Sequence, residues 1–300
     1  MSIQSFLSDY RRNEQRVIHM RRLKSNLPVP VILLVRFLKA SKCVLADWFA
    51  VTKNLFFPPF KNFGYCPCCR KKTVFTAMNL WLRDSFFCVR CNSLPRDRQV
   101  YKYINETFKD RTDLRVLEFA PLPGSYMHDR KTKSFVMSHY FQNEKFGKID
   151  ADFYNEDIQK TTFGDGSFDL IIHEDILEHI NDPFQALSDN LRILADDGMI
   201  VFTCPVRYDG NPTQQMCAVS DSGDLVYYHQ PVYHGNPIDA KGSLVFWDYG
   251  YDFEQQLRDK LPANIEITHI DAQDPRMGIM GEMVDLFCIR KLPAGNAPEQ

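Results

Sequence analysis

Two pairs of cysteines have the spacing of metal ligands. Cys66 and Cys69 form one Cys-x-x-Cys pair, Cys88 and Cys91 form the other, and 18 residues lie between the pairs. Each pair directs two sulfur atoms at one point, so two pairs supply the four thiolates of a closed tetrahedral zinc site. We predict that these residues hold a structural zinc ion. A dithiol redox pair and two pairs of buried cysteines are the alternatives.

A second group of polar residues follows an apolar run. Phe168 to Ile172 is short and rich in isoleucine, which is typical of a buried parallel strand. His173, Glu174 and Asp175 come directly after it. Parallel sheets bind ligands at the carboxyl ends of their strands, so we expect these side chains at a ligand site.

The elements that position this polar group form a strand-helix-strand unit. From Pro183 to Leu194, four apolar residues recur at spacings of three and four, which predicts one face of an amphipathic helix. They are Phe184, Leu187, Leu191 and Leu194. Asp196-Asp197-Gly198 is expected to stop the helix, and Met199 to Thr203 reads as a second buried strand. A right-handed crossover of this kind predicts a parallel sheet.

Similar patterns extend the sheet. Further strands are predicted at residues 114–120, 134–140, 265–270 and 284–290, and helices at residues 99–108 and 252–261. An aromatic, histidine-bearing insertion occupies residues 206–247, and loops of this length inside a compact domain are usually functional. We therefore expect an α/β domain over residues 99–292, followed by a disordered tail at residues 293–300.

Two smaller segments precede this domain. Residues 61–98 hold the four cysteines and a stretch of alternating polar and apolar residues, which predicts a zinc-ribbon-like module. Residues 1–60 read as a basic amphipathic helical arm that Pro28 and Pro30 divide. Residues 1–61 carry 11 Lys and Arg against three acidic residues, which favours an anionic partner such as a membrane surface or nucleic acid. A helix packed on its own domain or on a second subunit is the alternative.

The composition is that of a globular chain in a reducing compartment. Apolar residues make up 44 % and aromatic residues 13 % of the chain, which is ample for a buried core. The start shows no secretory-signal pattern, and the apolar stretch from Val29 to Leu38 is too short to span a bilayer. We predict a cytoplasmic location, with peripheral membrane association through the arm as a variant of it.

Three stretches together carry a family resemblance. They are VLEFAPLPG at 116–124, DGSFDLIIHEDILEHI at 165–180 and LRILADDGMIVFTCP at 191–205. Their order resembles a class I S-adenosylmethionine-dependent methyltransferase. The cysteine module and the Tyr-His-Gly-Asn-Pro loop at 233–237 look like one subgroup of that family. The resemblance covers about residues 65–290 and implies a Rossmann-like, mostly parallel seven-stranded sheet with helices on both faces.

The resemblance implies S-adenosylmethionine as cofactor and assigns positions to it. The matching residues are Glu118, Ala120, Pro121, Gly124, His139, Asp157, His173 and Glu174. The loop from Glu118 to Gly124 would bind the methionine and ribose. His139 stands where the family has an acidic ribose ligand, which is a departure, and Asp157 matches a residue that contacts adenine. His173 and Glu174 would lie beside the reacting methyl group.

Methyl transfer requires alignment of the reactants and, for some acceptors, a base. The two candidates for this base are His173 and His234. Between Tyr227 and Trp247 the insertion is aromatic, with one lysine and no arginine, which favours a small-molecule, glycan or lipid-linked glycan acceptor. The alternatives are a nucleic-acid-binding or RNA-modifying protein that uses the zinc module and arm, and a methyltransferase-fold scaffold without catalysis.

Overall fold

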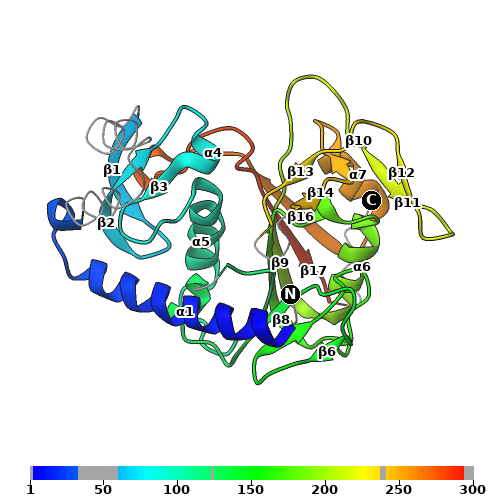
Figure 1. Ribbon diagram of the computed structural model, residues 1–300, viewed down its shortest axis with the longest axis horizontal. Helices are drawn as coiled ribbons and strands as arrows, with labels where there is room; N and C mark the ends of the chain where they lie inside the picture. The colour runs from blue at the N-terminus through cyan, green and yellow to red at the C-terminus, as the bar shows by residue number, and fades with distance from the viewer. Residues whose placement is uncertain (1–2, 33–59, 123–124, 237–240, 294–300) are drawn as a thin grey trace. The chain divides into compact units, whose positions relative to one another are not determined.

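The protein folds into two compact units. The computed structural model describes residues 3–32, 60–122, 125–236 and 241–293 (Figure 1). The first unit, here called the sheet unit, comprises Met1–Tyr10, Asp110–Ile270 and Asp285–Gln300. The second, here called the cysteine unit, comprises Arg11–Lys109 and Asp271–Val284.

The sheet unit is built on one eight-stranded mixed sheet. In sheet order its strands are β16 (Ile265–Ile270), β17 (Leu286–Lys291), β9 (Leu194–Thr203), β8 (Phe168–Glu174), β4 (Arg115–Phe119), β5 (Ser134–His139), β7 (Phe153–Asn155) and β6 (Gly147–Lys148). The five strands from β9 to β7 are parallel, and β17, β16 and β6 run antiparallel to their neighbours. The expected count of seven strands was wrong, because β6 adds an edge strand of two residues that has no sequence pattern of its own.

Helices cover one face of this sheet through a single apolar core. Helix α6 (Pro183–Ile193) and helix α7 (Phe253–Lys260) contribute Leu187 and Phe253 to it, against Ile171 of β8. Asp182 caps α6 by accepting a hydrogen bond from the Gln185 amide. The helix ends at Ile193, and Asp196-Asp197-Gly198, which was expected to form a turn, lies inside β9 because pairing with β8 already begins at Leu194.

The start of helix α1 (Ile3–Ser25) packs on the other face of the sheet. Its first two turns bury Phe6 and Tyr10 against Met137 of β5 and Phe153 of β7. Met137 neighbours Val136, which packs in the core under α6 and α7, so the two side chains point to opposite faces. The beginning of the predicted arm is therefore a helix packed on its own domain.

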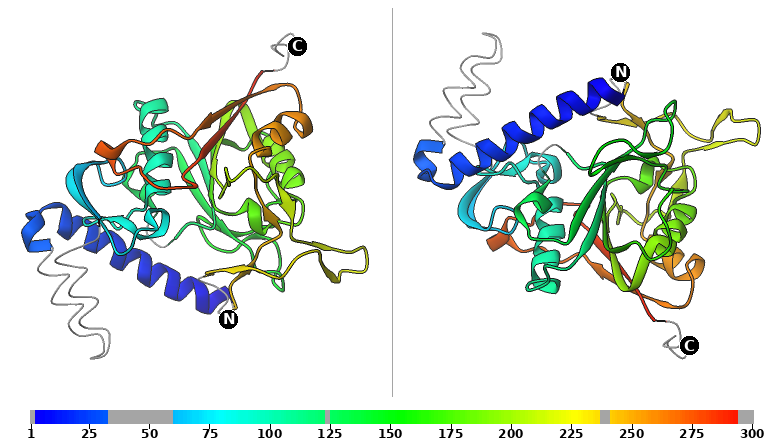
Figure 2. Two further views of the ribbon diagram at one scale, coloured as in Figure 1. Left: turned by 90° about the horizontal axis from the view of Figure 1, so that it is seen from above. Right: turned by 90° about the horizontal axis from the view of Figure 1, so that it is seen from below.

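The insertion after β9 is organised as three small antiparallel pairs. They are β10 (Gln214–Gln215) with β15 (Trp247–Asp248), β11 (Cys217–Val219) with β12 (Leu225–Tyr227), and β13 (Tyr233–His234) with β14 (Ser243–Leu244). Figure 2 shows the β11–β12 hairpin projecting away from the sheet. The side chains of β12 are exposed.

The described residues of the cysteine unit include a three-stranded antiparallel sheet, two further helices and the part of α1 from Arg11 onward. The strands are β1 (Phe60–Cys66), β2 (Lys71–Ala77) and β3 (Phe86–Cys88), and the helices are α4 (Leu82–Ser85) and α5 (Pro95–Thr107). The fully buried Arg98 of α5 donates from Nη2 to the carbonyl oxygens of Phe86, at 2.8 Å, and Gly278, at 2.7 Å. Its guanidinium also lies over the Phe75 ring.

The two units divide the chain differently from the predicted segments 1–60, 61–98 and 99–292, since Met1–Tyr10 belongs to the sheet unit and the chain from Arg11 to the cysteine unit. Residues 99–109 and 271–284 belong to the cysteine unit, although both were expected in the domain over 99–292. Arg98 is the physical link, because its hydrogen bonds hold the loop at Gly278 against β3. Gly278 has a φ of 68°, and a Cβ there would lie 2.7 Å from the Phe75 ring, so only glycine fits.

Residues 1–2 and 33–59 of the predicted arm lie outside the described residues, as do residues 294–300 of the predicted tail. Among the residues that the structure describes, no helix combines the length and apolar character needed to cross a bilayer.

Candidate functional site

The order of the strands defines a switch point between β4 and β8. From β4 the chain continues to β5 and β7 on one side, and then returns to β8 and β9 on the other. Ligands of such sheets bind in the crevice outside the carboxyl ends of the strands at this point. Ala120 follows β4 with a φ of 46°, and Asp175 follows β8 with a φ of 52°. Left-handed backbone at two non-glycine residues costs about 1–2 kcal/mol each and is concentrated at functional sites.

Hydrogen bonds hold both of these strained residues. The Ala120 amide donates to the Ser138 carbonyl at 2.6 Å, and the Asp175 amide donates to the Thr203 carbonyl at 3.1 Å. The Thr203 hydroxyl donates in turn to Asp175 Oδ1 at 3.0 Å. The conformation of both strand ends is thus determined by the neighbouring strands of the sheet.

The end of β4 and the loop after it contain four of the predicted cofactor residues. Glu118 is buried, and its carboxylate accepts a hydrogen bond from the Ser125 hydroxyl across the loop. Ala120 and Pro121 form the turn between them. Gly124 lies outside the described residues. Glu118 therefore holds the far end of this loop, at Ser125, against β4.

His139, at the end of β5, is buried in an aromatic cluster. Its ring stacks on Phe153 at 5.5 Å and meets the edges of Phe6 and Tyr10. Its Nε2 lies 3.2 Å from the carbonyl oxygen of Pro121, which also accepts a hydrogen bond from the Tyr10 hydroxyl. Burial lowers the pKa of His139 to about 4, against the opposing effect of that carbonyl. A neutral ring in this position supports the β4 loop.

Asp157 lies near the carboxyl end of β7 and is partly exposed. Its Oδ1 accepts a hydrogen bond from the Gln159 amide at 2.9 Å. Burial raises the pKa of Tyr140, and the negative charge of Asp157 raises it further. The Tyr140 side chain is 49 % exposed. An accessible aromatic face beside a carboxylate suits a flat heterocycle with amino groups.

His173 is a core residue in the described structure. It is 0 % exposed, its ring stacks on Phe202 at 4.9 Å, and neither ring nitrogen has a hydrogen-bond partner among the described residues. Burial lowers its pKa to about 3. Glu174 is the next residue and is partly exposed. Of the two predicted bases, His173 is enclosed, whereas His234 is exposed.

Sequence reasoning missed a cluster formed by Glu178, His179 and His234. Ligand atoms of the three side chains lie within 4.8 Å of one another. Glu178 Oε1 is 3.8 Å from His179 Nε2 and 4.0 Å from His234 Nδ1. The two imidazole rings stand at 90°, with centroids 5.0 Å apart. We call these three residues the Glu-His-His cluster.

The cluster forms because the insertion is hydrogen-bonded to the segment that follows β8. The Phe246 amide donates to the Glu178 carbonyl at 2.7 Å, and the Leu244 carbonyl lies 2.8 Å from His179 Nδ1. Pairing of β13 with β14 then sets His234 opposite Ser243. The sequence showed His179 after β8 and two histidines, His229 and His234, in the insertion. It could not show their contact, because His179 and His234 are more than 50 positions apart.

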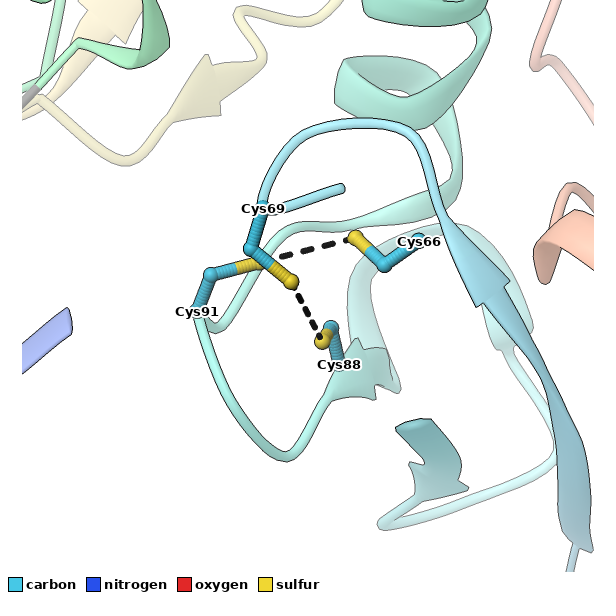
Figure 3. Close-up of side chains that lie close together, drawn as sticks. All are labelled: Cys66, Cys69, Cys88 and Cys91. Atoms are coloured by element: carbon cyan, nitrogen blue, oxygen red, sulfur yellow. Dashed lines mark hydrogen bonds between the residues drawn. The ribbon is translucent and has the colours of Figure 1, made fainter. Parts of the chain in front are cut away.

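In the cysteine unit, the four predicted ligands converge (Figure 3). The sulfur of Cys66 is 3.6 Å from that of Cys91, and the sulfur of Cys69 is 4.0 Å from that of Cys88. Tetrahedral zinc with Zn–S bonds of about 2.3 Å requires sulfur separations of about 3.8 Å. Burial opposes ionisation of Cys66, but hydrogen bonds from Cys68, Cys69 and Cys88 hold its pKa well below the usual value. These sulfurs could hold a metal ion.

Burial raises the pKa of Cys68, and a hydrogen bond with Cys66 raises it further. Cys68 is absent from the group of sulfurs that surround one point among the described residues. Cys68 lies in the loop between Cys66 and Cys69 and has no ligand role in this cluster.

Comparison with known proteins identifies the middle of the sheet unit. Residues 132–202 match the model of a family described as methyltransferase domain. The matched segment runs from β5 to β9 and includes the carboxyl end of β8. The chain therefore carries a segment that is similar to a methyltransferase domain, and this segment lies within a Rossmann-like mixed sheet. The comparison with curated proteins found no match.

Solved structures that resemble part of this chain include an S-adenosylmethionine-dependent methyltransferase from Mesorhizobium loti, with 14 % identity over 64 % of this chain and 97 % of that chain and a TM-score of 0.41. Another is the 1,6-didemethyltoxoflavin-N1-methyltransferase of Burkholderia thailandensis, with 12 % identity over 66 % and 78 % of the two chains and a TM-score of 0.41. The [4+2]-cyclase SpnF has 13 % identity over 65 % and 80 %, with a TM-score of 0.40.

Proposed function

We propose that this protein is an S-adenosylmethionine-dependent methyltransferase whose acceptor is a small molecule, a glycan or a lipid-linked glycan. The observation that carries the proposal is that the matched segment, residues 132–202, contains β8, one of the two strands of the β4–β8 switch point, and β5, the neighbour of β4 in the sheet. Ala120 and Asp175 hold strained backbone at that point. Their strain is what a pre-formed ligand crevice at the edge of the sheet would require.

The residues that would hold the cofactor follow from this edge. The backbone of Ala120 and Pro121 would face its methionine and ribose, and Asp157 with Tyr140 would face its adenine. His139 has a supporting role here, because its buried ring contacts Pro121 from below. When bound, S-adenosylmethionine supplies a methyl group on a positively charged sulfur, which is already an activated leaving group. The protein then has to align the acceptor and exclude water.

His234 is the residue we propose to act on the acceptor's proton, and His173 is the weaker of the two original candidates. A general base has to reach the proton that it removes. His234 lies on the exposed strand β13, 4.0 Å from Glu178 in the segment after β8, whereas the burial of His173 separates it from any acceptor. The aromatic residues of the insertion, such as Tyr233 and Tyr228, offer exposed flat faces for a sugar ring or other uncharged acceptor.

We further propose that the four cysteines hold a structural zinc ion in a zinc-ribbon-like module, as in the methyltransferase subgroup that the sequence resembles. Four sulfurs at tetrahedral separations leave no position for a water molecule or substrate. An anionic partner or membrane surface for the basic arm, and a cytoplasmic location, remain proposals that rest on charge and composition.

Calorimetric titration with S-adenosylmethionine and with S-adenosylhomocysteine tests the main proposal. We expect saturable binding to the full chain. In Asp157→Ala we expect binding to weaken by about tenfold to a hundredfold, the effect of removing a charged hydrogen-bond partner. Asp221→Ala is the matched control, because Asp221 is an exposed carboxylate in the β11–β12 hairpin and should leave binding unchanged.

The enzyme proposal fails if neither compound produces heat or a thermal shift at millimolar concentration. Binding that is unchanged in Asp157→Ala would retain the cofactor but reject the assignment of this residue.

A further inference from the structure

We propose that Glu178, His179 and His234 bind a divalent transition-metal ion, and that this ion has an open position for an oxygen of the methyl acceptor. The metal site follows from the geometry of the Glu-His-His cluster alone. Its role toward the acceptor rests on the proposed methyltransferase function. The site is separate from the four-cysteine cluster, since the two belong to different units of the chain.

The three ligand atoms surround a space of the size of a metal ion. Glu178 Oε1 lies 3.8 Å from His179 Nε2 and 4.0 Å from His234 Nδ1. Both separations are too long for hydrogen bonds between these groups. The third side of this triangle is at most 4.8 Å. A point equidistant from the three atoms is then about 2.3–2.5 Å from each, a few tenths of an ångström longer than the bond lengths of about 2.0–2.2 Å for zinc with imidazole and carboxylate ligands.

The neighbouring backbone orients His179 for this role. A carbonyl oxygen only accepts hydrogen bonds, so the Leu244 carbonyl, 2.8 Å from Nδ1, places the proton of the neutral ring on that nitrogen. The lone pair of the neutral ring is then on Nε2, which is the atom that faces Glu178. Histidines that bind metals usually donate their other N–H to a carbonyl or carboxylate in this way.

The burial of the cluster is uneven in a way that suits a catalytic ion. The side chain of Glu178 is 1 % exposed, that of His179 is 17 % exposed and that of His234 is 45 % exposed. The charge of a divalent ion would stabilise the buried carboxylate of Glu178, and the two neutral imidazoles would bind the same ion. Exposure at His234 leaves access from the side of the insertion. Two histidines and one glutamate are a ligand set of catalytic zinc sites, in which a fourth position stays open.

A metal here would replace His234 as the group that activates the acceptor. A hydroxyl group of the acceptor bound to the ion loses its proton to solvent more readily, because the positive charge stabilises the oxyanion. The oxygen then forms a bond to the methyl carbon, the carbon–sulfur bond breaks, and its electron pair stays on the sulfur. His234 would act through the ion that it binds, as a ligand. Imidazole and carboxylate donors favour Zn²⁺ over Mg²⁺ or Ca²⁺.

Equilibrium dialysis of the full chain against micromolar Zn²⁺, followed by metal analysis, tests the site. We expect two zinc ions per wild-type chain and one in His234→Ala, with the second site weakened at least a hundredfold. His229→Ala is the matched control, since His229 is an exposed histidine of the same insertion outside the cluster, and it should keep both ions. His179→Gln provides a second variant in case His234→Ala loses its thermal transition.

Cobalt distinguishes the two sites by their ligands. Thiolate ligands give bound Co²⁺ a sulfur-to-metal charge-transfer absorption in the near ultraviolet that nitrogen and oxygen ligands do not give, whereas both kinds of site contribute visible bands. We expect His234→Ala to keep the charge-transfer absorption per chain and to lose one bound Co²⁺, together with the part of the visible absorption that belongs to the second site. The proposal is overturned if the wild type binds a single ion, or if the second ion persists in both histidine variants. S-adenosylmethionine binding measured on the same samples separates this outcome from a failure of the proposed function.

Discussion

The four-cysteine cluster and the Glu-His-His cluster are two groups of potential metal ligands built in opposite ways. The first joins residues of two short loops within 26 positions of the chain, with sulfurs 3.6 Å and 4.0 Å apart. The second joins the segment after β8 to the insertion, and one of its members is exposed. The difference teaches that closure and burial suit a structural ion, whereas an open side suits chemistry.

Each cluster also depends on a different part of the fold. The cysteine unit forms around its cluster, with β1, β2 and β3 carrying or flanking the four sulfurs. The Glu-His-His cluster depends on a sheet that is already complete and on the pairing of β13 with β14. Loss of the first ion should therefore unfold a unit, whereas loss of the second should leave the fold intact.

The largest expected effect is that of Cys88→Ser. Binding of structural zinc contributes about 10 kcal/mol or more to the folding of small zinc modules, so this variant should lose its ion and the ordered cysteine unit. Metal analysis and limited proteolysis between residues 60 and 109 measure both. Cys68→Ser is the control, and it should keep the ion. Retention of the full metal content by Cys88→Ser would show that the sulfurs are not its ligands.

Acid should destabilise the sheet unit through two buried histidines. The folded-state pKa values of His139 and His173, about 4 and about 3, lie below the ordinary 6.5. The unfolded chain therefore takes up protons first, and the stability present above pH 6.5 is lost as the pH falls toward 4, by on the order of 3 kcal/mol per histidine.

Urea unfolding between pH 7.5 and 4.5 measures this loss, with fluorescence and circular dichroism as probes. His173→Leu should flatten the dependence by about half, because its buried ring nitrogens lack described partners and leucine fills similar space. An acid dependence that is identical in wild type and His173→Leu would contradict the buried neutral histidine.

Chelation should separate the two clusters by rate. A brief treatment with EDTA should remove the ion of the open Glu-His-His cluster and leave the ion of the enclosed cysteine cluster. The lost stabilisation should be about 2–3 kcal/mol if the metal was present at about 100 times its dissociation constant. Metal content and thermal unfolding, followed over time, give the comparison. Simultaneous loss of both ions would remove the distinction between an open and a closed site.

The smallest effect is expected from Tyr10→Phe. Its hydroxyl donates to the Pro121 carbonyl at 3.2 Å, so its removal should cost about 1 kcal/mol of stability and weaken cofactor binding a few-fold through the β4 loop. Urea unfolding and calorimetry measure the two effects. Phe6→Leu is the matched control for the apolar contact of α1, since it has no hydrogen bond to the loop. An equal loss of cofactor affinity in both would assign the effect to packing.

Sequence patterns predicted the local elements well and the distant contacts poorly. β16 was predicted at residues 265–270, and the structure places it at Ile265–Ile270, because its ends are marked by a Pro-Ala-Asn turn and by Asp271. The four cysteines of the cluster could also be predicted from the sequence, since each Cys-x-x-Cys pair is a local pattern. β6 was missed because two residues carry no periodicity. This strand is defined by its antiparallel pairing with β7.

The candidate site was predictable only in part. His173 and Glu174 were expected just after the strand and instead form the last two residues of β8, and the alternation of side chains along β8 could not reveal that a neighbouring strand encloses His173 beside Phe202. The cluster at Glu178 was missed because its third member comes from the insertion, whose folding back is set by backbone hydrogen bonds such as that of Phe246. Contacts of this kind depend on tertiary structure.

A crystal structure of the full chain with S-adenosylhomocysteine would test the central claim most directly. The account predicts the ligand at the carboxyl ends of β4, β5 and β8, with its methionine beside Ala120 and Pro121, its adenine toward Asp157 and Tyr140, and its sulfur on the side of His234. A ligand bound elsewhere on the chain, or an empty switch point at saturating ligand concentration, would contradict it.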